Sequence, residues 1–110
     1  QTPGKIYGTV HYGTDPAHHL SSEGSYTLPW GASFASAFHL FSVEWSADSL
    51  IWRVDNIRFH AEKTGPPFDK RFHLLLNVAV GGNWPGSPDA STVFPQYMQV
   101  DYVRVYAKAR

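Results

Sequence analysis

Apolar and polar residues alternate over much of this chain, with the two-residue period of β-strands. β-Branched and aromatic residues predict strands at residues 5–12, 25–28, 37–45, 50–54, 57–59, 72–80 and 98–106. In the third strand, one face collects every second residue, namely His39, Phe41, Val43 and Trp45. Helix signals are scarce. Six or seven short strands joined by turns therefore predict an all-β, antiparallel β-sandwich or jelly roll.

Turn residues separate the predicted strands. Asp55-Asn56 predicts a tight hairpin, because Asn tolerates the left-handed backbone that such turns need. Residues 13–33 are rich in Gly, Ser, Pro and Asp and predict a long loop with one short strand. Residues 72–80 are almost wholly apolar, which predicts a central strand buried on both faces. No repeat or linker interrupts the chain, so a single domain is predicted over residues 1–110.

Composition excludes several classes of protein. The 110 residues allow one modest core, and Lys+Arg and Asp+Glu both number 9. This balance argues against nucleic acid and against a membrane surface as partners. No apolar run approaches the roughly 20 residues that span a bilayer. Cysteine is absent, which excludes a disulfide framework, and the lone Met98 with no signal-peptide pattern leads us to expect a processed or truncated chain.

Common catalytic and metal-binding motifs are also missing. The six His are scattered without zinc-ligand spacing. There is no Gly-x-Ser-x-Gly motif and no Cys, so a nucleophilic triad is rejected. Gly81-Gly82 is not followed by Lys and Ser or Thr, which excludes a phosphate-binding loop.

Three stretches of sequence carry a resemblance to a known family. They are residues 38–45 with 51–55, residues 76–86, and residues 100–106. In this order and spacing they resemble glycoside hydrolase family 16, and the Gly-Gly-Asn-Trp-Pro-Gly loop is similar to its laminarinase branch, the endo-β-1,3-glucanases. The resemblance implies a concanavalin-like jelly roll of two stacked sheets, one of them bent into a sugar-binding cleft. Residues 1–110 would be the C-terminal part of one catalytic domain, an incomplete half.

The catalytic motif of that family, Glu-x-Asp-x-x-Glu, is absent here. The glutamates are Glu23, Glu44 and Glu62, and none has the required spacing. A retaining glycosidase needs two carboxyl groups about 5–5.5 Å apart, one as nucleophile and one as general acid. The resemblance thus implies a fragment of a secreted endo-β-1,3-glucanase that hydrolyses laminarin-type β-glucan with retention, with no catalytic residue of its own. The alternative is a non-catalytic β-sandwich that binds glucan or assembles with itself.

Three residues are predicted to bind substrate. Trp84 lies in a Gly/Pro-framed loop, where the resemblance implies stacking on sugar and a packing role is the alternative. Asn77 is polar within an apolar strand and needs hydrogen-bond partners if buried. The resemblance places such an Asn in the cleft, bonded to sugar hydroxyls. His11 shares a strand face with Tyr7 and Thr9, and the resemblance places its His-Tyr-Gly near the cleft.

Other residues have less specific roles. Asp101 resembles a calcium ligand on the outer face, with an exposed strand Asp as the alternative. Calcium takes six to eight oxygens, so calcium is expected only with ligands from the missing half. For His39 a structural role is favoured, and Trp45 and Trp52 are expected in the core. A sandwich cut in half exposes strand edges and an apolar face, so the chain is expected to pair with the missing catalytic half or to self-associate.

Overall fold

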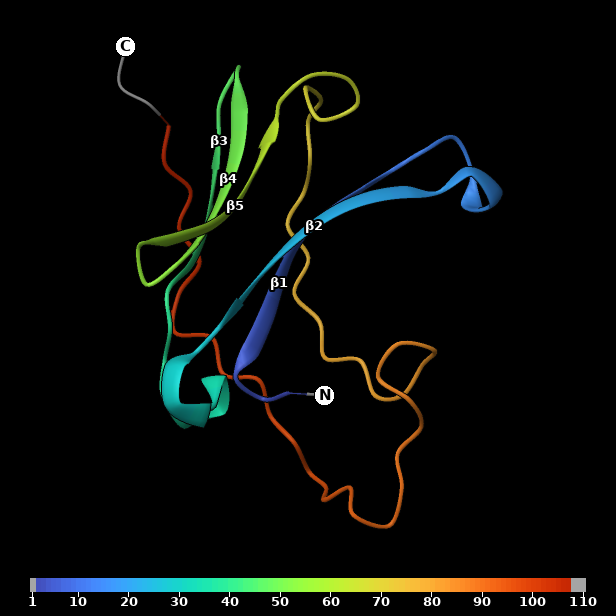
Figure 1. Ribbon diagram of the computed structural model, residues 1–110, viewed down its shortest axis with the longest axis vertical. Coiled ribbons are helices and arrows are strands. Elements are labelled where there is room, and N and C mark those ends of the chain that lie inside the picture. The colour runs from blue at the N-terminus through green and yellow to red at the C-terminus, as the bar shows by residue number, and fades with distance from the viewer. Residues whose placement is uncertain (1, 108–110) are drawn as a thin grey trace. The chain divides into compact units, whose positions relative to one another are not determined.

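The computed structural model describes residues 2–107, which form two compact units divided between Phe72 and His73. Among residues 2–107, all regular elements lie in the first unit (Figure 1). Its strands are β1 (Lys5–Tyr12), β2 (Leu20–Thr27), β3 (Phe41–Trp45), β4 (Ser49–Val54) and β5 (Ile57–Lys63). Its 3₁₀ segments are η1 (Pro16–His18), η2 (Pro29–Gly31) and η3 (Phe34–Ser36). Residues 2–107 include no helix long and apolar enough to cross a membrane.

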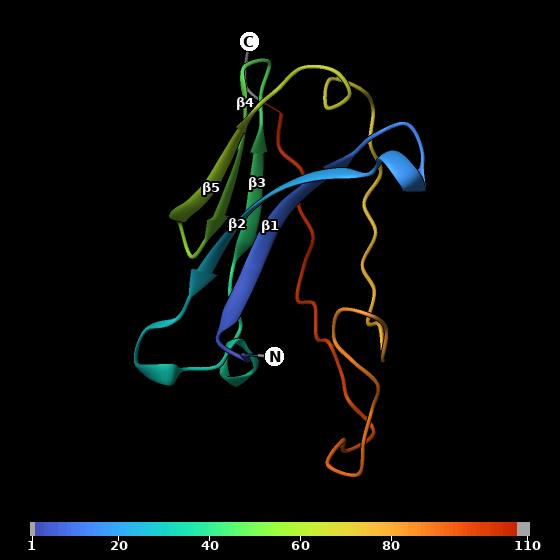
Figure 2. The ribbon, with the colours of Figure 1, turned by 45° about the vertical axis from the view of Figure 1, so that its right-hand side comes forward.

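The first sheet is a twisted antiparallel ribbon of β1 and β2 (Figure 2). Its register runs from Lys5 opposite Thr27 to Tyr12 opposite Leu20. The prediction of β1 is confirmed, whereas the prediction of only a short second strand at 25–28 is wrong. The Ser, Glu and Gly residues of β2 have low strand propensity, but pairing along all of β1 keeps them extended.

The second sheet has the order β3-β4-β5, and all its strands are antiparallel. The predicted hairpin between β4 and β5 is confirmed, since Asp55 and Asn56 adopt φ values of 48° and 67°. Successive left-handed residues give a turn whose twist matches that of the flanking strands. A bulge at Trp52 and Arg53 shifts the register between β4 and β5.

β3 begins at Phe41, not at residue 37 as predicted. The ladder stops there because Phe41 pairs with Val54, the last residue of β4. The residue after Val54 is Asp55, which already belongs to the turn. Asp55 holds the preceding segment instead. Its amide donates to the Leu40 carbonyl at 2.9 Å, and its Oδ1 accepts from the Leu40 amide at 2.9 Å.

The two sheets of the first unit pack face to face. Gly8 and Gly24 are opposite each other in the first sheet, and Trp52 and His60 are opposite each other in the second. A methyl group at Gly8 would lie 2.7 Å from the Trp52 ring, and one at Gly24 would lie 2.6 Å from the His60 ring. The two glycines therefore allow the rings to approach the backbone. The Ser22 hydroxyl also donates to Glu62 across the two sheets.

The core is small, with Val10, Leu50 and Val54 as its buried apolar residues. Trp52 lies between the sheets, as expected of a core residue. Trp45 lies on the same face of the second sheet as Trp52, but on β3, and it is 49% exposed. It is therefore only partly buried, whereas the sequence predicted a core position. The antiparallel all-β sandwich predicted from sequence is confirmed.

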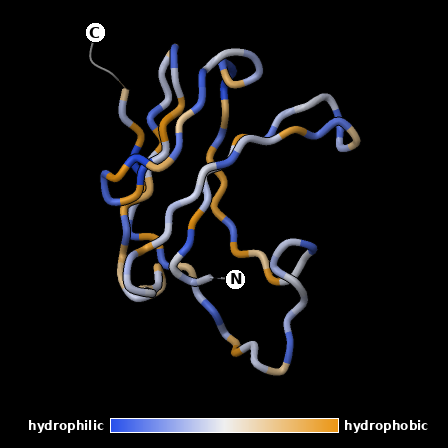
Figure 3. Tube along the Cα trace, in the orientation of Figure 1, coloured by the Kyte–Doolittle hydropathy of each residue, from blue (hydrophilic) through white to orange (hydrophobic). Residues whose placement is uncertain are grey.

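The predicted strands at 72–80 and 98–106 are wrong as strands. Neither segment has regular secondary structure, and both expose their apolar side chains. Figure 3 shows hydrophobic residues along the first of these segments. A strand requires a neighbour for its backbone N–H and C=O groups. The hydrophobic pattern indicates what such a segment could bury, but residues 73–107 contain no paired strand.

Candidate functional site

The outer face of the β1–β2 ribbon is polar and carries His11. Buried Gly8 and Val10 alternate with Tyr7, Thr9 and His11, so the predicted sharing of one face by these three residues is confirmed. Thr9 Oγ1 donates to Glu23 Oε2 at 3.1 Å across the ladder. The Lys5 ammonium lies 4.8 Å from the centre of the Tyr7 ring. An aromatic ring among hydroxyl and carboxylate groups is a surface chemically suited to sugars.

His11 does not stand alone at its end of the ribbon. Its Nδ1 lies 2.9 Å from Nε2 of His19, so that one imidazole donates a hydrogen bond and the other accepts it. The two rings stack with centres 5.1 Å apart and an angle of 22° between their planes. Both His residues line an open pocket with the loop that joins β1 to β2, whose other lining residues are Tyr12, Gly13, Thr14, Asp15 and Pro16.

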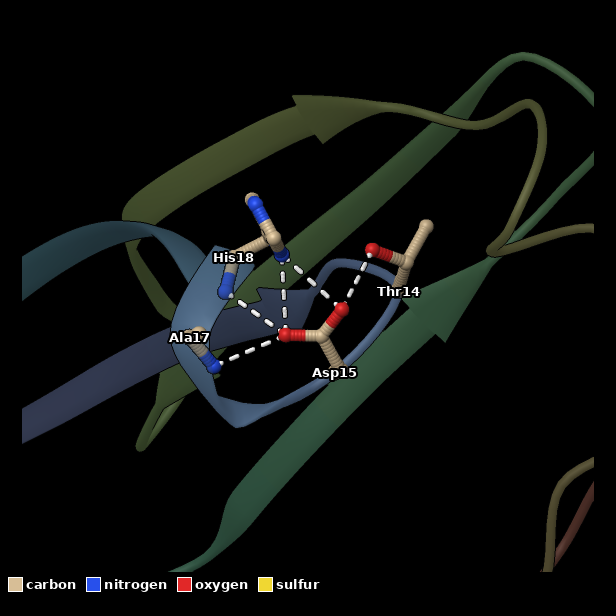
Figure 4. Close-up of polar contacts among 4 residues, drawn as sticks. All are labelled: Thr14, Asp15, Ala17 and His18. Atoms are coloured by element: carbon tan, nitrogen blue, oxygen red, sulfur yellow. Dashed lines mark hydrogen bonds and ion pairs between the residues drawn. The ribbon is translucent and has the colours of Figure 1, made fainter.

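Asp15 organises that loop (Figure 4). Its Oδ1 accepts from the amides of Ala17 at 2.9 Å and His18 at 3.1 Å, which caps η1. The His18 ring contacts the same carboxylate through Nδ1 at 2.9 Å, and Thr14 donates to Oδ2 at 3.2 Å. The hydrogen bond from His18, aided by these donors, holds the pKa of Asp15 below its usual value. The fixed loop sets the position of His19 beside His11.

Sequence reasoning missed the contribution of His19. The strand register would have indicated it. A full ladder places Tyr12 opposite Leu20, and this brings His11, which precedes Tyr12, close to His19, which precedes Leu20. The turn-forming composition of residues 13–33 predicts mostly loop and so conceals that register.

Trp84 belongs to the second unit and sits in a closed turn. The Gly86 amide donates to the Gly82 carbonyl at 2.9 Å. Gly81, Gly82 and Gly86 have φ values of 76°, 126° and 81°, which side chains larger than hydrogen rarely allow. The loop predicted here is confirmed, and Trp84 is 72% exposed. The exposed ring is consistent with a binding role, which stays a prediction.

Asn77 and Asp101 also belong to the second unit and are exposed. The prediction that Asn77 lies in a strand buried on both faces is wrong, because residues 73–80 form no strand. Its proposed contact with sugar stays a prediction. Within residues 2–107, no three His, Cys, Asp or Glu side chains gather in a way that could hold a metal ion. The predicted calcium role of Asp101 stays a prediction.

His39 and Glu44 take structural positions. The centres of the His39 and Phe34 rings lie 4.9 Å apart in a T-shaped contact. His39 Nδ1 donates to Asp55 Oδ2 at 2.7 Å. This hydrogen bond, with a second from the Leu40 amide, keeps the pKa of Asp55 below its usual value. Glu44 faces the other side of the second sheet, where its Oε1 accepts from Arg53 Nε at 2.6 Å. Neither residue belongs to the His11 pocket.

Known proteins are similar to this chain over most of its length. Residues 1–104 match the sequence model of glycosyl hydrolases family 16. The glucan endo-1,3-beta-glucosidase A1 of Niallia circulans is 42% identical over 94% of this chain and 17% of that protein. The endo-beta-1,3-glucanase structure from Pyrococcus furiosus superposes with a TM-score of 0.72 and 39% identity, over 86% of this chain and 39% of that one. A beta-1,3-glucan-binding protein of Penaeus monodon is 30% identical over 80% of this chain and 31% of its own length.

Proposed function

Because this chain belongs to glycosyl hydrolase family 16, we propose that it forms part of an endo-β-1,3-glucanase that cleaves laminarin-type β-glucan. The observation that carries the substrate class is the identity with β-1,3-glucan hydrolases across nearly the whole chain. The chain spans well under half of those proteins, so the activity belongs to a larger assembly of which these residues are a part.

The role of this chain is to build the wall of the cleft. His11, Tyr7 and Thr9 line the outer face of the ribbon, where sugar hydroxyls meet imidazole and hydroxyl groups. Trp84 offers a flat ring for the apolar face of a pyranose, and Asn77 offers an amide for its hydroxyls. Within each unit these groups bind the polymer, and binding energy of this kind helps to hold the scissile bond against the reacting groups.

The catalytic carboxylates come from outside these 110 residues. Retention of configuration requires a nucleophile and a general acid about 5–5.5 Å apart. Glu23 lies on the ribbon face and bonds to Thr9, Glu44 pairs with Arg53, and Glu62 lies between the sheets with Ser22. Each glutamate thus has a different hydrogen-bond partner in a different part of the fold, and none of them belongs to a Glu-x-Asp-x-x-Glu motif.

Two further features follow from this assignment. The protein acts outside the cell, because a β-glucan polymer is too large to reach an enzyme inside it.

Asp101 contributes one carboxylate to a structural calcium ion, whose remaining oxygens come from the part of the domain that carries the catalytic strand. The same part covers exposed apolar side chains of β3, such as those of Phe41 and Val43.

A second candidate function is glucan binding without hydrolysis. The similarity to a β-1,3-glucan-binding protein favours it, since that protein also matches most of this chain. Both functions need the same cleft wall, and they differ only in the presence of the two carboxylates.

The test is a reducing-sugar assay on laminarin. The chain is refolded alone and together with a polypeptide that carries the Glu-x-Asp-x-x-Glu strand of a family 16 laminarinase. We expect activity only in the mixture, and a partner with its nucleophilic Glu changed to Gln is the matched control. A soluble, inactive mixture that retains laminarin binding would favour the second candidate. Hydrolysis by the chain alone would overturn the proposed division of labour.

A further inference from the structure

Trp30 occupies an unusual turn directly after β2. Within η2 its backbone is left-handed, with φ 53° and ψ 28°, and Gly31 follows with φ 71°. The Ala32 amide donates to the Pro29 carbonyl at 3.2 Å and closes the turn. Two successive residues with positive φ make this a turn of the kind that favours Asn-Gly or Gly-Gly. A bulky residue in the left-handed region is a genuine outlier.

Packing does not compensate for this backbone strain. Trp30 is 99% exposed, compared with 72% for Trp84 and 49% for Trp45. A methyl group placed on Gly31 would meet no atom within 4 Å, so the turn projects into open space. The residue therefore combines a strained backbone with a fully exposed indole, and neither cost is offset by contacts in the described chain. Residues held in sparsely populated backbone regions cluster at active sites and ligand-binding sites.

The turn is nevertheless held firmly to the first unit. Before it, the Leu28 amide donates to the Gly4 carbonyl at 2.8 Å. After it, the Phe34 amide donates to the Pro3 carbonyl at 3.1 Å. Pro29 restricts the backbone at its start. The indole is thus presented from an anchored base, which lowers the entropy lost when a ligand binds to it.

The surroundings of Trp30 indicate a neutral, flat ligand. Its neighbours along the chain include Pro29, Gly31 and Ala32, none of which carries a charge or a side-chain hydrogen-bonding group. Such a surface offers only the faces of an aromatic ring, which stack on the C–H face of a sugar. We propose that Trp30 is a second glucan contact, at which the indole stacks on one pyranose ring of a β-glucan chain. This inference rests on the β-glucan specificity proposed above.

Trp30 is separate from the His11 pocket. It follows the Thr27 end of the ribbon, whereas His11 and His19 lie at the end where Tyr12 pairs with Leu20. Seven residue steps along a strand separate these ends by roughly 23 Å. A short oligosaccharide does not span that distance, so the contact at Trp30 acts on polymeric glucan. It would hold a long chain near the cleft between cleavage events.

The test measures retardation of the intact protein in native gels that contain increasing laminarin. Trp30→Asn removes the ring and supplies a residue that suits the left-handed backbone, so folding is preserved or improved. Trp30→Tyr keeps an aromatic face. By analogy with the stacking of nucleobases on aromatic residues, we expect Trp30→Asn to weaken laminarin binding about tenfold and Trp30→Tyr to retain most of it. Thermal unfolding of each variant confirms that the fold is intact.

The outcomes separate the two proposals. Retardation of the wild type and equal retardation of Trp30→Asn would overturn the role of Trp30 and leave the glucan assignment standing. Failure of the wild type itself to be retarded would overturn both the role of Trp30 and the glucan assignment.

Sedimentation velocity on the same samples tests the competing partner, a second copy of the chain. A shift from dimer to monomer in Trp30→Asn with unchanged laminarin binding would assign the ring to self-association, and the glucan contact would be wrong.

Discussion

Gly8 lies directly against the indole ring of Trp52, so close that a methyl group on Gly8 would be 2.7 Å from two ring carbons. The same methyl group would also be 3.0 Å from the Phe59 ring. Here the first sheet meets the second, and the missing side chain of Gly8 creates the space that Trp52 fills. The packing of the two sheets in the first unit depends on this small-to-large match.

Gly8→Ala should therefore destabilise the protein by about 1–3 kcal/mol, because the Trp52 ring or the strand must move. Urea unfolding of the intact protein measures the change. In a Trp52→Ala background the added methyl group finds room, and the cost should fall sharply, which gives a coupling energy in a double-mutant cycle. Equal costs in the two backgrounds would show that Gly8 is required for another reason.

Acid should weaken the link between Asp55 and His39. The hydrogen bond from His39 holds the pKa of Asp55 below its ordinary value of 3.8. A carboxylate with a lowered folded-state pKa stabilises the fold above its unfolded pKa, and that contribution is lost as pH falls through the folded value. The loss should therefore appear below about pH 4. Asp55 is 44% exposed in its side chain, so solvent screens the effect.

The measurement is the urea midpoint of wild type and Asp55→Asn between pH 6 and about pH 2.5. Asn suits the left-handed backbone of the hairpin and keeps the turn. The difference in stability between the two proteins should shrink as pH falls. A difference that stays constant over this range would mean that the charge of Asp55 contributes nothing to the fold.

Trp84→Ala should weaken laminarin binding by roughly 1–3 kcal/mol, by analogy with other stacking aromatics. Fold stability should change little, because the ring is 72% exposed in a closed loop. Titration calorimetry and thermal unfolding of the intact protein provide the two measurements. Trp84→Phe is the control, since it keeps a stacking face. Normal binding combined with a much lower melting temperature would make Trp84 a packing residue.

The chain by itself should not behave as a monomer. Phe41 and Val43 are 55% and 54% exposed on the face of β3 that continues the covered face of β4. Val43→Thr keeps nearly the same shape but replaces one methyl group by a hydroxyl, so it should reduce association while it preserves strand propensity. Sedimentation velocity of the isolated chain compares the two proteins. A wild-type chain that sediments as a compact monomer would refute the prediction.

Local chemistry decided several parts of the fold in advance. The bounds of β1, the alternation of β4 and the hairpin at Asp55 and Asn56 all follow from strand periodicity and from the backbone freedom of Asn. The closed loop around Trp84 follows from the three glycines that frame it. Motif order within the sequence also indicated the family, because those motifs are specific in combination.

Only the tertiary structure decided which residues meet across the chain. The stacking of His11 on His19 depends on the full register of β2, a strand whose polar residues conceal it. The approach of Trp52 to Gly8 depends on the packing of one sheet on another. Residues 72–80 have the pattern of a central strand and form none, since the hydrogen bonds of a strand come from neighbours that its own sequence does not supply. Periodicity determines which side chains a segment can bury, and pairing partners determine whether it does.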